Sequence, residues 1–121
     1  MHLQESGEMY LETLLILSLQ GKGVRAVDVG EYMGFSKPSV SRAMGLLKGA
    51  GYVELDENGF LVLTESGREV AGKTYERHRI LTDFFAGIGV DPETAAKDAC
   101  KIEHDISDET FAALKKYLGK E

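Results

Sequence analysis

The turn MGFSKP at residues 33–38 separates two short helical patterns, and it constrains the fold more than any other feature of the sequence. The first pattern covers residues 26–33 and ends at Gly34. In the second, Ser36 is a favourable N-cap and Pro38 occupies the first turn, where a missing N–H costs little. Two short helices joined by a tight, glycine-containing turn are typical of a helix-turn-helix.

The segments on either side of this pair predict a winged form of the motif. Apolar residues between Met9 and Leu19 follow a helical period. After the pair, two strand-like runs flank Asn58-Gly59, which is the strongest short-range signal for a β-hairpin. Three helices and a hairpin therefore predict a winged helix-turn-helix, a fold that binds DNA.

A helical region follows the hairpin. Thr64 caps a long helical pattern, and Asp91 and Ser107 cap two shorter ones. We therefore expect a mainly α protein. Its winged helix-turn-helix DNA-binding domain would cover residues 1–70, and a second, helical domain would cover residues 71–121.

Charge is unevenly distributed along the chain. The net charge of −6 argues, taken alone, against nucleic acid as a partner. Between Lys22 and Gly51, however, five basic and two acidic residues give a local charge of +3. This segment fits either a phosphate-binding face or a solvated helix surface.

Composition indicates a cytoplasmic globular protein. The hydrophobic fraction is 43% and the charged fraction 28%, as in ordinary folded domains. No apolar run approaches the roughly 20 residues that cross a bilayer, so no membrane partner is expected. The N-terminus has no signal-peptide pattern, and the single cysteine fits a reducing compartment.

The helix after Ser36 is the predicted recognition helix, which enters the major groove with its N-terminal residues forward. Arg42 can reach a guanine edge, and hydroxyl groups suit phosphates. Alternatively, Ser36 and Pro38 serve only the start of the helix. The predicted DNA contacts are Arg25, Ser36, Lys37, Pro38, Ser39, Ser41 and Arg42. Acidic residues in the hairpin predict a mainly structural wing: Glu54, Asp56 and Glu57.

The stretch CKIEHD contains the only cysteine, Cys100, followed by Glu103 and His104. If a helix continues through it, these three residues share one face. Sulfur, oxygen and nitrogen donors together can hold a divalent transition metal when other residues add ligands. A nucleophilic cysteine beside a histidine and a purely structural triplet are the alternatives, and the triplet alone leaves all three open.

Nearly the whole chain resembles the diphtheria toxin repressor family of metal-dependent regulators, in a short form without the SH3-like domain. The resemblance is carried by GEMYLETLLIL, FSKPSVSRAMGLLKGAGYVELDENGFLVLTESGREVA and RHRILTDFFAGIGVDPETAAKDACKIEHDISDET. Its E-M-Y and C-x-x-E-H elements are the most specific. It implies that residues 71–121 bind metal and dimerise. The homodimer would repress transcription at a palindromic operator when metal-loaded, with no enzymatic activity and no organic substrate.

The resemblance also implies the primary metal ligands Met9, Cys100, Glu103 and His104, which match the iron-type site. The manganese branch has carboxylates in place of Met9 and Cys100. Thioether and thiolate ligands are soft, so this set favours iron(II), with manganese, cobalt, nickel or zinc as substitutes in vitro.

A second metal site is implied only in part. His78 matches an iron-branch ligand, whereas Thr82 and Ala96 stand where that branch has two further ligands. Glu12 matches a carboxylate ligand of the manganese branch. The resemblance therefore suggests a hybrid second site formed by Glu12 and His78.

The last two helices are expected to supply the dimer contact through the residues Ile102, Ile106, Phe111, Leu114 and Tyr117. Three alternatives to an iron-responsive repressor follow from the same residues. One is a manganese-responsive regulator of this family. The others are a winged-helix regulator without a metal effector and a winged helix used for protein–protein contact.

Overall fold

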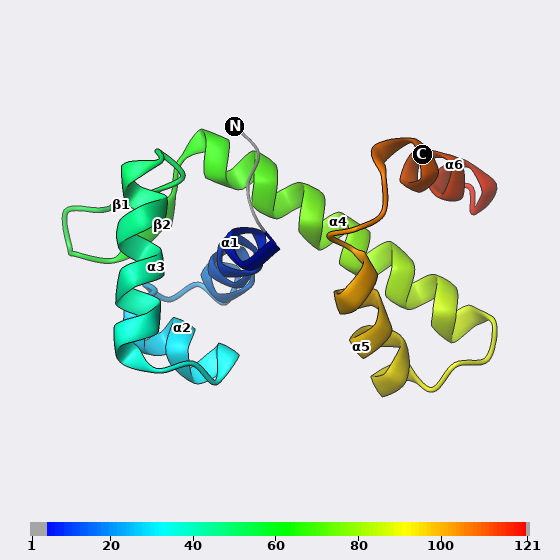
Figure 1. The fold of residues 1–121 in the computed structure, drawn as a ribbon, viewed down its shortest axis with the longest axis horizontal. Helices are drawn as coiled ribbons and strands as arrows, with labels where there is room; N and C mark the ends of the chain where they lie inside the picture. Colours follow the sequence, from blue (N-terminus) through cyan, green and yellow to red (C-terminus); the bar gives the residue numbers. More distant parts are fainter. Residues whose placement is uncertain (1–4, 121) are drawn as a thin grey trace. The chain divides into compact units, whose positions relative to one another are not determined.

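The computed structural model describes residues 5–120 and consists of two compact units, with the division between Lys73 and Thr74 (Figure 1). The first unit contains α1 (Glu5–Ser18), α2 (Ala26–Met33), α3 (Lys37–Gly49), β1 (Val53–Leu55) and β2 (Leu61–Leu63). α4 (Glu65–Gly87) begins in the first unit and ends in the second, which also contains α5 (Pro92–Ile102) and α6 (Asp108–Tyr117). Along the described part of the chain, no helix has the length and apolarity to cross a membrane.

The predicted helix-turn-helix is confirmed by α2 and α3. Gly34 ends α2 with φ +74°, a left-handed conformation that glycine adopts without steric cost, and its N–H donates to Gly30 O at 2.8 Å. The Ser36 side chain then accepts a hydrogen bond from the backbone N–H of Ser39, and Pro38 lies in the first turn of α3. The turn residues therefore act locally, as expected from their chemistry.

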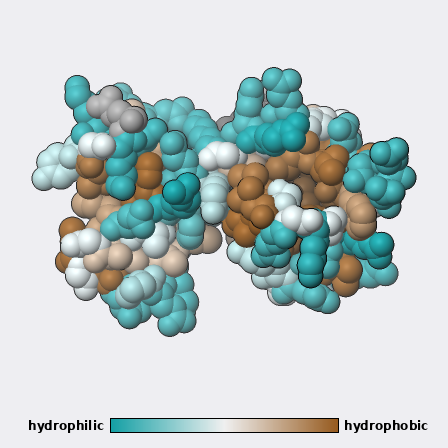
Figure 2. Space-filling view, turned by 180° about the vertical axis from the view of Figure 1, so that it is seen from behind, coloured by the Kyte–Doolittle hydropathy of each residue, from teal (hydrophilic) through white to brown (hydrophobic). Residues whose placement is uncertain are grey.

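One hydrophobic core holds the first unit together. α2 packs on α3, α1 packs on α2 and β2, and α3 packs on β1. Leu11 and Leu14 of α1 are almost completely buried, and truncating either to alanine would cost about 2–5 kcal/mol. The buried core residues are Tyr10, Leu11, Leu14, Val24, Val29, Val40, Met44, Leu47, Val53, Leu61, Leu63 and Ala71. The face of the molecule in Figure 2 carries hydrophobic as well as hydrophilic residues at its surface.

The wing is a two-stranded antiparallel hairpin in which Val53 pairs with Leu63. Asp56 organises its tip, because Oδ1 accepts hydrogen bonds from the N–H groups of Asn58 (2.8 Å) and Phe60 (3.0 Å). Asp56 thus has a structural role at the tip of the wing.

Thr64 joins the wing to α4, and its hydroxyl makes two hydrogen bonds. Its Oγ1 donates to Gly51 O at 2.6 Å and accepts from the N–H of Gly67 at 3.1 Å. Thr64→Ala should lower the free energy of unfolding by about 1–2 kcal/mol, the usual cost of losing an N-cap. Urea denaturation measures this loss. Thr64→Ser keeps the hydroxyl and is the control, and equal losses in both variants would contradict a role for the cap.

In the second unit, α5 and α6 begin at the predicted caps. The Asp91 carboxylate accepts from the N–H groups of Glu93 and Thr94, and the Ser107 hydroxyl accepts from the N–H of Thr110. The side chains buried in this unit are Thr74, Arg77, Ile80, Leu81, Ala95, Ala99, Glu103 and Phe111.

The described structure corrects two expectations about this unit. α5 ends at Ile102, so Glu103 is its C-cap and His104 lies in the following turn, rather than both continuing the helix. Phe111, expected at the dimer contact, is buried, with only 6% of its surface exposed, and its ring lies 5.4 Å from the Arg77 guanidinium. Of the other expected dimer residues, Ile102 and Tyr117 are exposed.

Candidate DNA-binding face and metal centre

The N-terminal half of α3 presents a polar, basic face to solvent. Lys37, Pro38, Ser41 and Arg42 are exposed and follow the i, i+4 spacing of one helix side. The opposite side carries the core residues Val40, Met44 and Leu47. Burial of that apolar side therefore fixes which side chains α3 can offer to a ligand.

The other predicted DNA residues have local structural contacts as well. The hydroxyls of Ser36 and Ser39 hydrogen-bond to each other at 2.9 Å. Arg25 is exposed, and its guanidinium lies 5.1 Å from the ring centre of Phe60. That ring packs so tightly on Gly23 that a Cβ there would lie 2.5 Å from it. Arg25 is thus held beside the hairpin by a cation–π contact.

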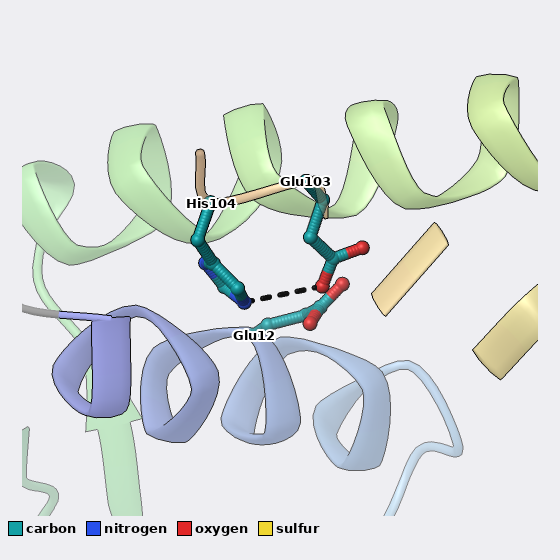
Figure 3. A group of neighbouring side chains, drawn as sticks. All are labelled: Glu12, Glu103 and His104. Carbon is teal, nitrogen blue, oxygen red and sulfur yellow. Dashed lines mark ion pairs between the residues drawn. The ribbon is translucent and has the colours of Figure 1, made fainter. Parts of the chain in front are cut away.

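In the second unit, the Glu103 carboxylate lies between two imidazoles. Its Oε2 is 2.9 Å from Nδ1 of His78, and its Oε1 is 3.3 Å from Nε2 of His104 (dashed in Figure 3). The side chains of Glu103 and His104 are 0% and 1% exposed, and that of His78 is 29% exposed. Of the predicted metal-binding residues, the structure therefore brings these three together.

The remaining predicted ligands lie on helices. Cys100 forms no disulfide and lies half-buried on α5, one turn before Glu103. On α1, Met9 is half-buried and Glu12 is buried, three residues apart and so on the same side of the helix (Glu12 is labelled in Figure 3).

Arg77 was not anticipated from the sequence. It is 7% exposed, and its guanidinium donates to the backbone oxygens of Glu103 and Ile106 and to the carboxylate of Asp108. The only signal in the sequence was that Arg77 directly precedes His78. The backbone carbonyls that Arg77 binds cannot be recognised from the sequence, because every residue has one.

The donor chemistry fits a divalent transition metal. A buried carboxylate is costly without a positive partner, and an ion held by carboxylate and imidazole groups offsets that cost. Carboxylate and imidazole are already adjacent at Glu103, and the thiol of Cys100 is on the preceding helical turn. The group can therefore hold a cation without a large rearrangement of Glu103 and its two histidines.

Comparison with known proteins decides the family. Residues 2–61 match the model of the iron dependent repressor N-terminal DNA binding domain. Residues 64–120 match the model of the iron dependent repressor metal binding and dimerisation domain. The chain belongs to the iron-dependent repressor family. Members of this family are metal-dependent transcriptional regulators, not enzymes, so the resemblance expected from the sequence is confirmed.

Two curated transcriptional regulators are similar to this family member. The transcriptional regulator MntR of Escherichia coli O6:H1 is 32% identical over 119 residues, which cover 98% of this chain and 77% of the relative. The diphtheria toxin repressor of Corynebacterium diphtheriae is also 32% identical, over 96% of this chain and 52% of its own length.

A solved structure supports the same fold. A manganese-dependent transcriptional repressor in complex with manganese superposes with a TM-score of 0.83 and 27% identity, over 95% of this chain and 53% of that one. This family member therefore spans about half the length of that repressor and of the diphtheria toxin repressor.

Proposed function

We propose that this protein is an iron(II)-responsive repressor that binds a palindromic operator as a homodimer when it is metal-loaded, in the cytoplasm. The observation that carries the proposal is the buried carboxylate of Glu103 between the imidazoles of His78 and His104. A DNA-binding domain and a metal binding and dimerisation domain in one chain give such a site a regulatory role.

The proposed primary ligands are Met9, Cys100, Glu103 and His104. Glu12 and His78 are proposed to form a second site. The contact between His78 and Glu103 supports placing His78 beside the primary ligands. A bound divalent cation would supply the positive charge that holds these donors together. The proposed set contains residues of α1 and of the second unit, so ligation would restrict the motion of α1.

The choice of metal follows from ligand softness. The thiol of Cys100 and the thioether of Met9 favour iron(II) over manganese(II), which prefers oxygen ligands. Manganese is the second candidate, because Glu12 offers a buried carboxylate and relatives at 32% identity are named MntR.

Coupling to DNA would work by selection among conformations. Without metal the two recognition helices of a dimer would sample several separations, and the loaded form would favour the separation of about one helical turn of DNA. Residues such as Ile102 and Tyr117, which are 37% and 85% exposed, are available for contact with a second copy.

Selection from a pool of random-sequence DNA duplexes tests the proposed function. Purified protein is incubated with the pool under anaerobic conditions, in parallel with iron(II), manganese(II) or a chelator. We expect an inverted repeat to be enriched with metal and not with chelator. Equal enrichment with chelator would contradict metal dependence, and stronger enrichment with manganese would replace iron as the effector.

Arg42→Ala should weaken binding to the selected duplex by about 10-fold or more and relax the base preference, because a side chain that contacts a base edge contributes about 1–3 kcal/mol of discrimination. Fluorescence anisotropy on the selected duplex and on single-base variants measures both effects. Lys97→Ala, which removes an exposed positive charge from α5, is the control. Equal losses in the two variants would show that Arg42 contributes net charge alone.

A further inference from the structure

Arg77 is a buried cation that binds three points of the chain that follows α5. Nη1 donates to the backbone oxygens of Glu103 (3.0 Å) and Ile106 (2.6 Å). Nη2 donates to Oδ1 of Asp108, the first residue of α6, at 2.5 Å. One planar guanidinium therefore spans the whole turn between the two helices.

A guanidinium that donates to three groups at once restricts the turn more than separate contacts would. The guanidinium has fixed donor directions, so the carbonyls and the carboxylate that it binds are fixed relative to one another. Carbonyls at the end of a helix have no partner within it, and Arg77 provides one for Glu103. The nearby ring of Phe111 restricts the guanidinium in turn.

Two consecutive residues of α4 hold Glu103 from both ends. Arg77 binds its backbone oxygen, and His78 contacts its carboxylate. Residues of α4 therefore hold Glu103 at its backbone oxygen and at its carboxylate, while its own N–H donates to Ala99 O of α5 at 2.9 Å. His104 follows directly in the turn whose main chain Arg77 holds.

We propose that Arg77 is a positioning residue for metal binding, which holds Glu103 and His104 in the ligating arrangement and ties their turn to the start of α6. This inference rests on the proposed function, because it takes Glu103 and His104 as ligands. It adds a physical link from the ligands to α6, which carries the exposed Tyr117.

The test uses the full chain with Arg77→Lys, which keeps the positive charge and loses the planar guanidinium. Cobalt(II) affinity should fall about 10- to 100-fold, as when a residue that orients a ligand is lost, and the cobalt absorption spectrum should change. In the metal-free protein, hydrogen exchange at the amides of Asp105 and Ile106, which both donate to Ile102 O, should accelerate. An exchange rate and a spectrum equal to those of the unmutated protein would overturn the proposal.

Lys115→Gln is the matched control, because the ion pair of Lys115 with Glu76 (3.1 Å) also joins α6 to α4 but does not touch the turn. The cobalt affinity and spectrum of Lys115→Gln should stay unchanged. A loss of affinity as large as that of Arg77→Lys would show that Arg77 only stabilises the fold. If Arg77→Lys does not fold, Asp108→Asn removes one charge at a side chain that is 73% exposed. It should weaken cobalt binding about 2- to 10-fold, and no change would overturn the proposal.

Different results would refute the proposed function and the role of Arg77. An unmutated protein that does not bind cobalt would refute the proposed function, and the role of Arg77 with it. An unmutated protein that binds cobalt as tightly as the Arg77→Lys variant would refute the role of Arg77 alone.

Discussion

Gly67→Ala is expected to lower the free energy of unfolding by at least about 3 kcal/mol, near the upper end of the cost of overpacking. A Cβ at this position in α4 would lie 2.1 Å from the backbone oxygen of Tyr52 and 3.2 Å from the side chain of Leu63. The oxygen of Tyr52 cannot easily move away, because it accepts the N–H of Thr64 at 3.0 Å. The close approach of α4 to the wing therefore requires glycine.

Gly72→Ala provides the matched control in the same helix. A Cβ there has no neighbour within 4 Å among the described residues, so the higher helix propensity of alanine should stabilise the protein by up to about 1 kcal/mol. The two substitutions are chemically identical and should have opposite signs in urea denaturation followed by circular dichroism. Destabilisation of similar size in both would contradict the packing argument.

Glu103→Gln is expected to reduce metal affinity at least about 100-fold, more than the loss of a residue that only orients a ligand. The substitution keeps the size of the side chain and removes the charge that attracts the cation. Competition with a fluorescent chelator for cobalt(II) or manganese(II) measures the affinity. The same variant should bind the selected duplex equally with metal and with chelator.

Asp105→Asn is the control for Glu103→Gln. It distinguishes metal ligation by Glu103 from the general effect of negative charge in the turn. Asp105 is exposed and lies two residues further along, so it contributes negative charge without touching the buried carboxylate. Its metal affinity should stay within about twofold of that of the unmutated protein, since exposed charges are largely screened. Metal affinity preserved in Glu103→Gln would remove Glu103 from the ligand set and, with it, the main support for the proposed function.

The helices and the hairpin could be predicted because the signals that define them are local. Ser36, Thr64, Asp91 and Ser107 each bond to backbone groups two or three residues further along, so the sequence places these caps without reference to the rest of the fold. The alternation of apolar residues around Asn58-Gly59 likewise identified the wing.

The end of the helix within CKIEHD could not be predicted, for the opposite reason. A continuous helix would put Cys100, Glu103 and His104 on one face, but the helix stops at Ile102. The carbonyls beyond that point bond to Arg77, more than 20 residues earlier in the chain. A partner so distant leaves no periodic pattern, so the sequence could not indicate where the helix ends.

By itself, the sequence determined the winged helix-turn-helix, the helical second region and the family. These depend on local caps, on apolar spacing and on motifs that lie within single segments. Only the tertiary structure decided that Glu103 lies between two imidazoles and that Phe111 is buried beside Arg77. Both arrangements arise where α4 packs on the turn after α5, and side-chain packing between distant segments is not encoded in any one of them.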